Sequence, residues 1–302
     1  MEEDSIVPPR PTTSRRSRQR SHVTRVAGRR AIADLLARTR PLTARSVLAT
    51  VLLGAPAPEL GVSDLIVAAS VFGISAGATR TSLWRMVANG ELSMSNATYA
   101  LDGGLLERRD SVEDAARPAH TLSTPWERTW DLAVVSAGRR PATERLELRK
   151  AAAALHLAEI REGVWTRPDN LDPQRLRRSR AVLDQQCLHY RHATTNINIE
   201  SITTLFQLGP WAHDARRLTD AMTNELDPSL GDATDTLAYQ FTLSITVVRH
   251  LQLDPQLPAE LLPNDWPAAV LRNTYRHYDA AFKRRLNHAM APSERLASTP
   301  QT

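Results

Sequence analysis

The chain has 302 residues, of which 42% are hydrophobic and 24% are charged, an ordinary globular composition with room for about two or three domains. A single cysteine excludes an internal disulfide, and no run of about 20 apolar residues indicates a membrane span. The N-terminus also lacks the apolar segment of a secretory signal. We therefore expect a cytoplasmic protein without membrane contact.

The basic charge is concentrated at the N-terminus. Although the formal net charge is +5, residues 1–40 contain ten arginines and four acidic residues, which leaves 28 basic and 29 acidic residues in the rest. We expect residues 1–40 to form a basic, disordered leader with a short helix over residues 31–37, and residues 291–302 to form a disordered tail. The leader is either an arm that contacts DNA phosphates or a solvated tail.

Three helical patterns follow one another closely in residues 41–115, the expected first domain. Each begins at a capping residue and ends at a glycine, from Thr43 to Gly54, from Ser63 to Gly73, and from Ser75 to Gly90. An alternating hairpin pattern over residues 91–101 comes directly after the third helix. This order predicts a winged helix-turn-helix domain, in which the third helix enters the major groove of DNA.

Helical spacing divides the third helix into an inward and an outward side. Thr79, Leu83 and Met86 belong to the inward stripe. Outward arginines can bond guanine edges, threonine can contact a base, and short hydroxyl side chains can reach phosphates. The expected DNA-binding residues are Ser75, Thr79, Arg80, Thr81, Trp84 and Arg85, together with Arg45 of the first helix. Two alternatives remain open: the domain is a protein-interaction module, or Trp84 folds back into the core of the wing.

The second expected domain spans residues 120–175. A strand over residues 126–136, a helix over 143–157 and a strand pair over 158–168 form half of a ferredoxin-like split βαβ unit. The overall prediction is thus an α+β multidomain protein, and the third domain, residues 176–290, is predicted to be helical. Its first helix is expected to run from Arg175 through Cys187.

The helical domain is expected to supply effector binding and dimerisation. Its aromatic side chains can line a pocket for an aromatic acid, with basic groups to meet a carbonyl or phosphate. The candidate effector-binding residues are Trp211, Arg216, Tyr239, Arg249 and His250. The competing interpretation is that these aromatics are core residues of a helix bundle. We expect no metal site, no cofactor and no catalytic residue, because no known catalytic or cofactor motif is present.

Several motifs, in the right order, resemble the PaaX family of regulators, named for the repressor of phenylacetic acid degradation. They cover about residues 41–285 and comprise residues 43–48 (TARSVL), 79–81 (TRT), 85–87 (RMV), 90–92 (GEL), 130–135 (WDLAVV), 162–171 (EGVWTRPDNL) and 253–267 (LDPQLPAELLPNDWP). The long basic leader departs from the pattern of the family. So does Trp84, where a small polar residue is expected.

The resemblance implies a bacterial transcriptional regulator, located at the nucleoid when bound. It would be a homodimer on a double-stranded DNA operator and a repressor that an aryl-acyl-CoA thioester releases. The central domain of the family is also similar to small CRISPR adaptation nucleases, whose metal-binding aspartate ends the first strand. Here that strand ends without a carboxylate, and Asp131, at its beginning, is expected to face solvent. A metal-dependent nucleic-acid enzyme and a ligand-independent DNA-binding or scaffold protein are the alternatives.

Overall fold

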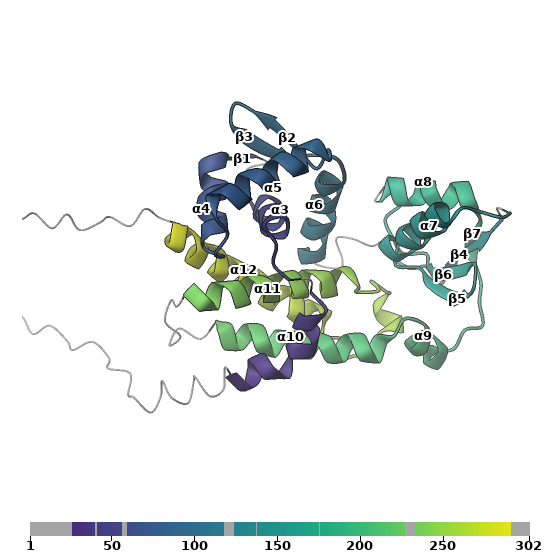
Figure 1. The fold of residues 1–302 in the computed structure, drawn as a ribbon. Coiled ribbons are helices and arrows are strands. Elements are labelled where there is room, and N and C mark those ends of the chain that lie inside the picture. The colour runs from purple at the N-terminus through teal and green to yellow at the C-terminus, as the bar shows by residue number, and fades with distance from the viewer. Residues whose placement is uncertain are drawn as a thin grey trace, which may run out of the picture.

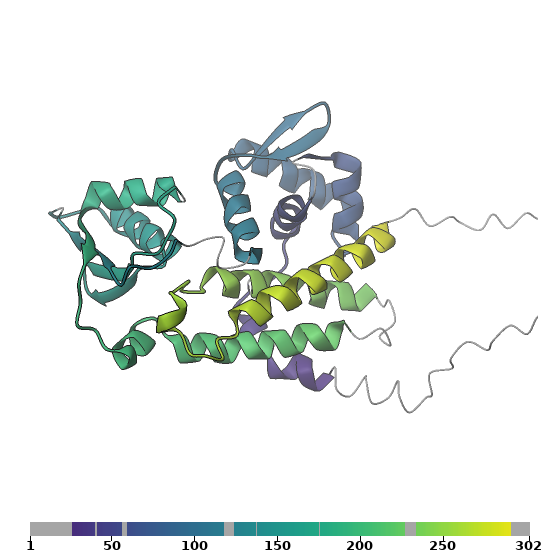
Figure 2. The ribbon, with the colours of Figure 1, turned by 180° about the vertical axis from the view of Figure 1, so that it is seen from behind.

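The computed structural model describes residues 26–39, 41–55, 59–117, 124–136, 138–174, 176–226 and 234–290. Three units are visible in Figures 1 and 2: a small α+β unit above a layer of long helices, and a second α+β unit at one end of that layer. None of the helices within the described ranges is long and apolar enough to cross a membrane. The chain is therefore a mixed α and β protein with two antiparallel sheets, as the predicted fold class requires at that coarse level.

The first unit follows the predicted order of elements. Its helices and strands are α3 (Ala44–Gly54), β1 (Glu59–Gly61), α4 (Val62–Ser70), α5 (Ala76–Ala88), β2 (Leu92–Ser95), β3 (Thr98–Leu101) and α6 (Gly103–Ala116). The three strands form an antiparallel sheet in the order β1-β3-β2. Strand β1 and helix α6 were not predicted, and Gly61 rather than Ser63 precedes α4.

Local sequence explains most of these boundaries. Thr43 and Ser46 form a reciprocal capping box at the start of α3. The hairpin turn has positive φ angles at both Asn96 (49°) and Ala97 (61°), the conformation of a two-residue turn whose twist matches its strands. Gly103 has a φ of 49°, and a Cβ there would lie 2.6 Å from the carbonyl oxygen of Gly90. A glycine is therefore needed where α6 leaves the hairpin against the end of α5.

The second unit contains two βαβ halves rather than one. Its elements are β4 (Trp130–Val135), α7 (Ala142–Ala154), β5 (Ala158–Arg161), β6 (Val164–Pro168), α8 (Arg177–Gln186) and β7 (Cys187–Ala193). All neighbouring strands are antiparallel, in the order β5-β6-β4-β7. Helices α7 and α8 cover one face, on which Ala133, Trp165 and Cys187 are buried together.

The expected long helix through Cys187 is wrong. Helix α8 ends at Gln186, and Cys187 begins β7, which pairs with β4 from Val135↔Cys187 to Trp130↔Ala193. The sheet thus extends beyond residue 175, where the sequence placed the end of the central domain. Arg175 lies outside the described residues.

The third unit is a helix bundle. It consists of α9 (Ile199–Leu205), α10 (Leu208–Glu225), α11 (Thr234–Gln252), the 3-10 helix η2 (Ala259–Leu261) and α12 (Ala268–Met290). Helix α10 packs on both α11 and α12, and α11 packs on α12. Leu218, Met222 and Leu271 are almost fully buried among these helices.

Residues 26–39 belong to this bundle, which corrects the prediction of a disordered leader through residue 40. Residues 26–31 are helical, α2 covers Ala33–Ala37, and Ile32 and Leu35 are buried in the core of the bundle. Arg29 donates to the buried carboxylate of Glu225 at 3.0 Å, which joins the segment to α10. Residues 1–25 lie outside the described part of the chain. In both views the α2 segment lies on the side of the bundle away from α5.

A buried polar junction connects the second unit with the bundle. The carbonyl oxygen of Gln256 accepts from Asn170 Nδ2 at 3.1 Å and from Arg167 Nη2 at 3.3 Å. Arg167 also donates to the carbonyl of Leu155 at 2.6 Å, although its side chain is almost completely buried. A backbone carbonyl that receives two buried donors fixes the 253–258 loop to the sheet.

Candidate nucleic-acid interface

Helix α5 is held in the first unit by its inward side. Ser75 caps the helix by accepting a hydrogen bond from the amide of Ala78 at 3.2 Å, and Asn89 ends it as predicted. Leu83 and Met86 are buried in a core formed with α3, α4 and the hairpin. The rotation of the helix is thus fixed, and the opposite side is turned to solvent.

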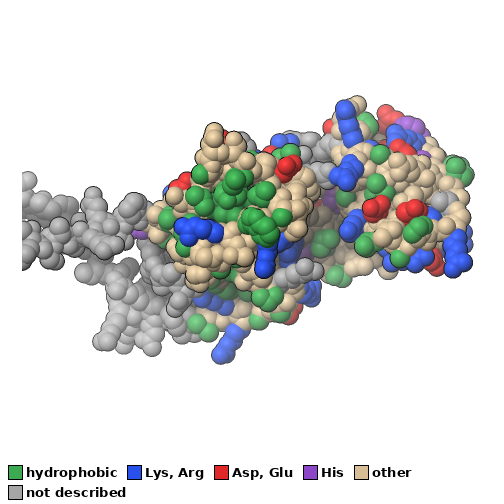
Figure 3. Space-filling view, turned by 45° about the horizontal axis from the view of Figure 1, so that its top comes forward, with side chains coloured by type: hydrophobic (Ala, Val, Ile, Leu, Met, Phe, Trp, Pro, Cys, Tyr) green, Lys and Arg blue, Asp and Glu red, His purple; other side chains and the backbone are tan. Residues whose placement is uncertain are grey.

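Four of the expected DNA-binding residues share that exposed side: Arg80, Thr81, Trp84 and Arg85. They form two adjacent pairs, 80/81 and 84/85, that lie four residues and thus about one helical turn apart. Helix α5 contains no acidic residue, so its outer surface carries two positive charges without compensation from its own sequence. Figure 3 shows this side of the molecule, where hydrophobic side chains gather with basic side chains beside them.

Trp84 is exposed, so the alternative in which it folds back into the wing is wrong. Its exposed fraction is 70%, the highest among the exposed large hydrophobic residues of the described ranges. The prediction that Thr79 contacts DNA is wrong for the opposite reason. It is fully buried, and its hydroxyl donates to the carbonyl of Ser75 at 3.0 Å, so it cannot contact DNA.

Arg45 lies on α3 and is engaged within the unit. Its Nε donates to Glu91 Oε2 at 2.8 Å and its Nη2 to Glu91 Oε1 at 2.8 Å, a bidentate pair that connects α3 with the start of the hairpin. The pair occupies the Nε and Nη2 donors of Arg45, with which arginine would otherwise bind a phosphate. Neither Glu91 nor this pairing was identified from the sequence, because the two residues are far apart in the chain.

A second arginine of this unit meets the bundle. Arg108 lies on α6, which packs against α11. Its pKa is lowered by burial and then by the positive charges of Arg249 and Arg45. Arg108 thus lies within electrostatic range of Arg249 on α11 and of Arg45 on α3, and Arg45 is itself paired with Glu91.

Two of the expected effector-binding residues form a closed aromatic cluster with a third ring. Trp211 stacks on His250 with centroids 4.7 Å apart and on Trp266 with centroids 4.6 Å apart. The indole of Trp211 donates to the carbonyl of His250, and Nε2 of His250 donates to the carbonyl of Trp211, each at 3.0 Å. Burial lowers the pKa of His250 and favours the neutral ring. The rings fill the space between the helices with each other, which is the arrangement of a core.

Of the other three expected effector-binding residues, Arg216 lies beside this cluster, because it binds Asp265, the residue directly before Trp266. Tyr239 is covered by the guanidinium of Arg29, 4.0 Å from its ring centroid. Arg216 pairs with the exposed Asp265 at 2.5 Å, and Arg249 lies near Arg108. The binding of an effector by these five residues stays a prediction.

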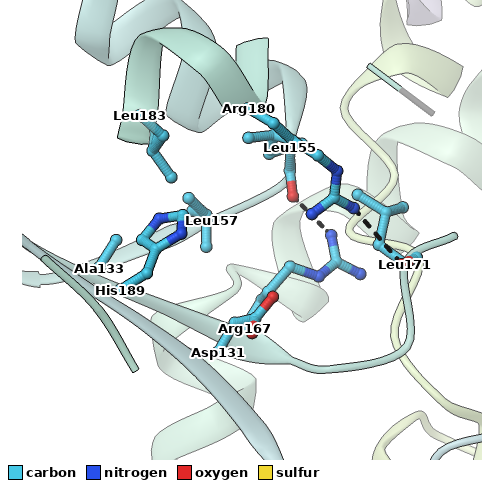
Figure 4. Close-up of a pocket in the computed structure, with 9 residues that line it drawn as sticks. All are labelled: Asp131, Ala133, Leu155, Leu157, Arg167, Leu171, Arg180, Leu183 and His189. Carbon is cyan, nitrogen blue, oxygen red and sulfur yellow. Dashed lines mark hydrogen bonds between the residues drawn. The ribbon is translucent and has the colours of Figure 1, made fainter. Parts of the chain in front are cut away.

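A small pocket lies instead in the second unit, between the sheet and α8 (Figure 4). It is lined by Asp131, Ala133, Leu155, Leu157, Arg167, Leu171, Arg180, Leu183 and His189. Asp131 was expected to face solvent, but its Oδ1 is buried and accepts no hydrogen bond from the described residues. Burial, and then the nearby charge of Asp169, raise the pKa of Asp131.

One residue of the exposed surface was missed by the sequence interpretation. Met94 lies on β2 and is 59% exposed. It shares a side of the hairpin with Leu92, which is buried against the helices, because alternate residues of a strand face the same way. That alternation was visible in the sequence, but only the structure shows that the core ends before Met94.

Two family models match the chain. The model of the PaaX-like protein matches residues 43–103, and the model of the PaaX-like protein C-terminal domain matches residues 210–291. The structure also resembles a solved structure described as uncharacterized protein Rv0674 from Mycobacterium tuberculosis. The two sequences are 33% identical, the match covers 82% of this chain and 98% of that chain, and the TM-score is 0.61. No curated protein matches this chain in sequence.

Proposed function

The chain belongs to the family of PaaX-like proteins, and from that premise we propose that it is a DNA-binding transcriptional regulator and not an enzyme. Residues 41–116 act as a winged helix-turn-helix reader, with α5 as the recognition helix and the β2–β3 hairpin as the wing. Residues 130–193 form a ferredoxin-like domain, and the helix bundle completes the regulator.

The observation that carries the proposal is the outer side of α5. Arg80, Thr81 and Arg85 are exposed there, on the second helix of a helix-turn-helix order and directly before a hairpin. Arginine forms bidentate hydrogen bonds with guanine, and threonine can bond a base edge. We assign base readout to Arg80 and Arg85, and a phosphate contact to Ser75 at the start of the helix.

A dimer matches this mode of binding, because two recognition helices reach successive major grooves of a palindromic operator. The second unit offers a surface for it. Leu188 (55% exposed) and Tyr190 (52% exposed) lie on the sheet face away from α7 and α8, paired with Val134 and Leu132. An exposed apolar face of this kind marks a site of protein interaction, and a second copy would cover it symmetrically. Leu188→Glu is expected to yield monomers in light scattering, whereas the matched Leu146→Glu on α7 (53% exposed) leaves a dimer.

The likeness to PaaX proteins supports repression that an aryl-acyl-CoA thioester relieves. Such an effector can release DNA only by binding the DNA-incompetent arrangement more tightly. Arg108 and Arg249, which lie within electrostatic range of each other, offer charges for the phosphates of such a ligand, whereas Trp211 is already stacked on His250 and Trp266.

The first test is DNA binding by the full chain. Fragments from upstream of its own gene and neighbouring genes are titrated at two salt concentrations, with and without phenylacetyl-CoA. Tight, sequence-selective binding that the thioester weakens supports a ligand-responsive repressor. Selective binding that no aryl-CoA changes supports the ligand-independent alternative. Salt-sensitive binding without sequence preference would contradict readout by α5 and assign the affinity to the arginines of residues 1–25.

A nuclease assay separates the regulator from the enzymatic alternative. DNA and RNA are incubated with the protein and Mg²⁺ or Mn²⁺, and Asp131→Asn serves as the variant. We expect no cleavage above that of the variant. Metal-dependent cleavage that Asp131→Asn abolishes would contradict the regulator proposal.

A further inference from the structure

We propose that Trp84, together with Met94 of the hairpin, forms an apolar surface that recognises the 5-methyl group of thymine in the major groove. This inference rests on the proposed DNA-binding function. It adds to that function the chemical group that α5 selects, beyond the hydrogen bonds of its arginines.

The position of Trp84 is the first step. It lies one helical turn after Arg80 and directly before Arg85, on the exposed side of α5. With 70% of its surface exposed, the indole leaves a large apolar area in water. Its burial against a partner is therefore favourable, by about 25 cal/mol for each Å² of apolar surface removed from water.

Met94 is a second exposed apolar side chain of the same unit, on the hairpin that follows α5. It is 59% exposed on the side of β2 that also carries Leu92, and β2 packs against α5. A flexible thioether adapts its shape to an irregular apolar partner. Both the helix and the hairpin that follows it thus carry an exposed apolar side chain.

Charge and chemistry identify the partner. Arginines flank Trp84, and α5 has no carboxylate, which favours a polyanion over an apolar protein surface. Among the base pairs of DNA, the major-groove edge of thymine alone presents a methyl group. An apolar ring set between two arginines therefore matches a site in which a thymine lies between positions read by hydrogen bonds.

The experiment removes only the methyl group. An operator fragment selected by the full-length protein is prepared with each thymine replaced in turn by deoxyuridine. We expect the replacement to weaken binding about threefold to tenfold at one or two positions in each half-site, the effect of losing about one buried methyl group. With Trp84→Ala the same replacements should change affinity less than twofold.

Two controls define the result. Val270→Ala removes another exposed apolar side chain (59%) far along the chain on α12, and it should retain the full response to deoxyuridine. 5-Bromodeoxyuridine at the sensitive positions, which keeps the size of the methyl group, should cross-link to Trp84 on irradiation. Because Trp84 is exposed, Trp84→Ala should melt at the wild-type temperature.

The outcomes separate the two proposals. Selective binding that no deoxyuridine replacement weakens overturns this inference and leaves the DNA-binding proposal standing. This inference is also overturned if Trp84→Ala responds to deoxyuridine as the wild type does. It is overturned as well if Trp84→Ala changes the oligomeric state of the protein, because the surface would then bind a protein partner. If the wild-type protein selects no DNA sequence, both proposals fail.

Discussion

The outer side of α5 and the Trp211 cluster of the bundle both combine tryptophan with basic residues, yet they differ in how those groups are used. On α5, Trp84 is 70% exposed between two exposed arginines. In the bundle, Trp211 is 6% exposed, stacked between His250 and Trp266, with its indole NH bonded to a carbonyl.

The difference in exposure between the two tryptophans indicates which of them is available to bind a ligand. A group that already has its stacking partners and hydrogen bonds gains little from a ligand, because binding would have to replace existing contacts. A group that stays exposed has contacts still to make. Both regions contain a tryptophan in the sequence, but only the structure shows that Trp84 is exposed and that Trp211 is packed between two other rings.

The largest expected effect is on the free energy of unfolding, which should distinguish Trp211→Ala from Trp84→Ala. Trp211→Ala should lower the free energy of unfolding by about 3–5 kcal/mol, because it leaves a cavity and unpaired polar groups. Trp84→Ala should change it by no more than about 0.5 kcal/mol. Urea denaturation measures both. If Trp211→Ala is as stable as the wild type but loses affinity for an aryl-CoA, the cluster is a binding site after all.

The next largest effect is on DNA binding, in which Arg85→Ala should differ from Arg216→Ala. Arg85→Ala should reduce the free energy of operator binding by about 1–3 kcal/mol and loosen the preference at one base pair. Arg216→Ala removes the same charge from the bundle, and it should leave both the free energy of operator binding and the base preference unchanged. Fluorescence anisotropy on operator and random DNA measures the two. Equal losses of Arg85→Ala on operator and random DNA would mean that Arg85 contacts only phosphate.

A smaller effect depends on pH and concerns His250. Because burial depresses its pKa below the ordinary 6.5, the unfolded chain binds a proton more readily than the folded one between 6.5 and the lower folded pKa. Stability contributed by the neutral ring is thus present above pH 6.5 and lost as the pH falls through this window, by at most about 1.4 kcal/mol per pH unit. Melting curves from pH 7.5 to 5 should show a shallower decline for His250→Gln. Identical slopes would contradict the buried, neutral ring.

The smallest effect concerns the ion pair at the rim of the cluster. Arg216 and Asp265 have half or more of their side chains exposed, so solvent screens their attraction. Arg216→Ala should change the free energy of unfolding by less than about 1 kcal/mol, and added salt should reduce even that difference. A larger loss in urea denaturation would show that the pair supports the 253–267 segment.

Local signals predicted the first unit well and the later ones in part. The caps at Thr43 and Ser75, the stop at Asn89 and the inward side of α5 follow from nearest neighbours and helical periodicity. The strand Cys187–Ala193 was not predicted, and its first residue was assigned to the preceding helix, because this short run lacks a decisive period. Its strand form depends on hydrogen bonds to β4, more than 50 residues earlier in the chain.

By itself, the sequence determined the family, the order of the helices and hairpin in the first unit, and which residues of α5 face outward. These features depend on contacts between residues close in the chain. Only the tertiary structure decided that Ile32 joins the bundle core, that one carboxylate oxygen of Asp131 is buried, and that Trp211 is packed against other rings. Each of these depends on partners distant in the sequence, and burial by such partners decides whether a side chain stabilises the fold or remains free to bind.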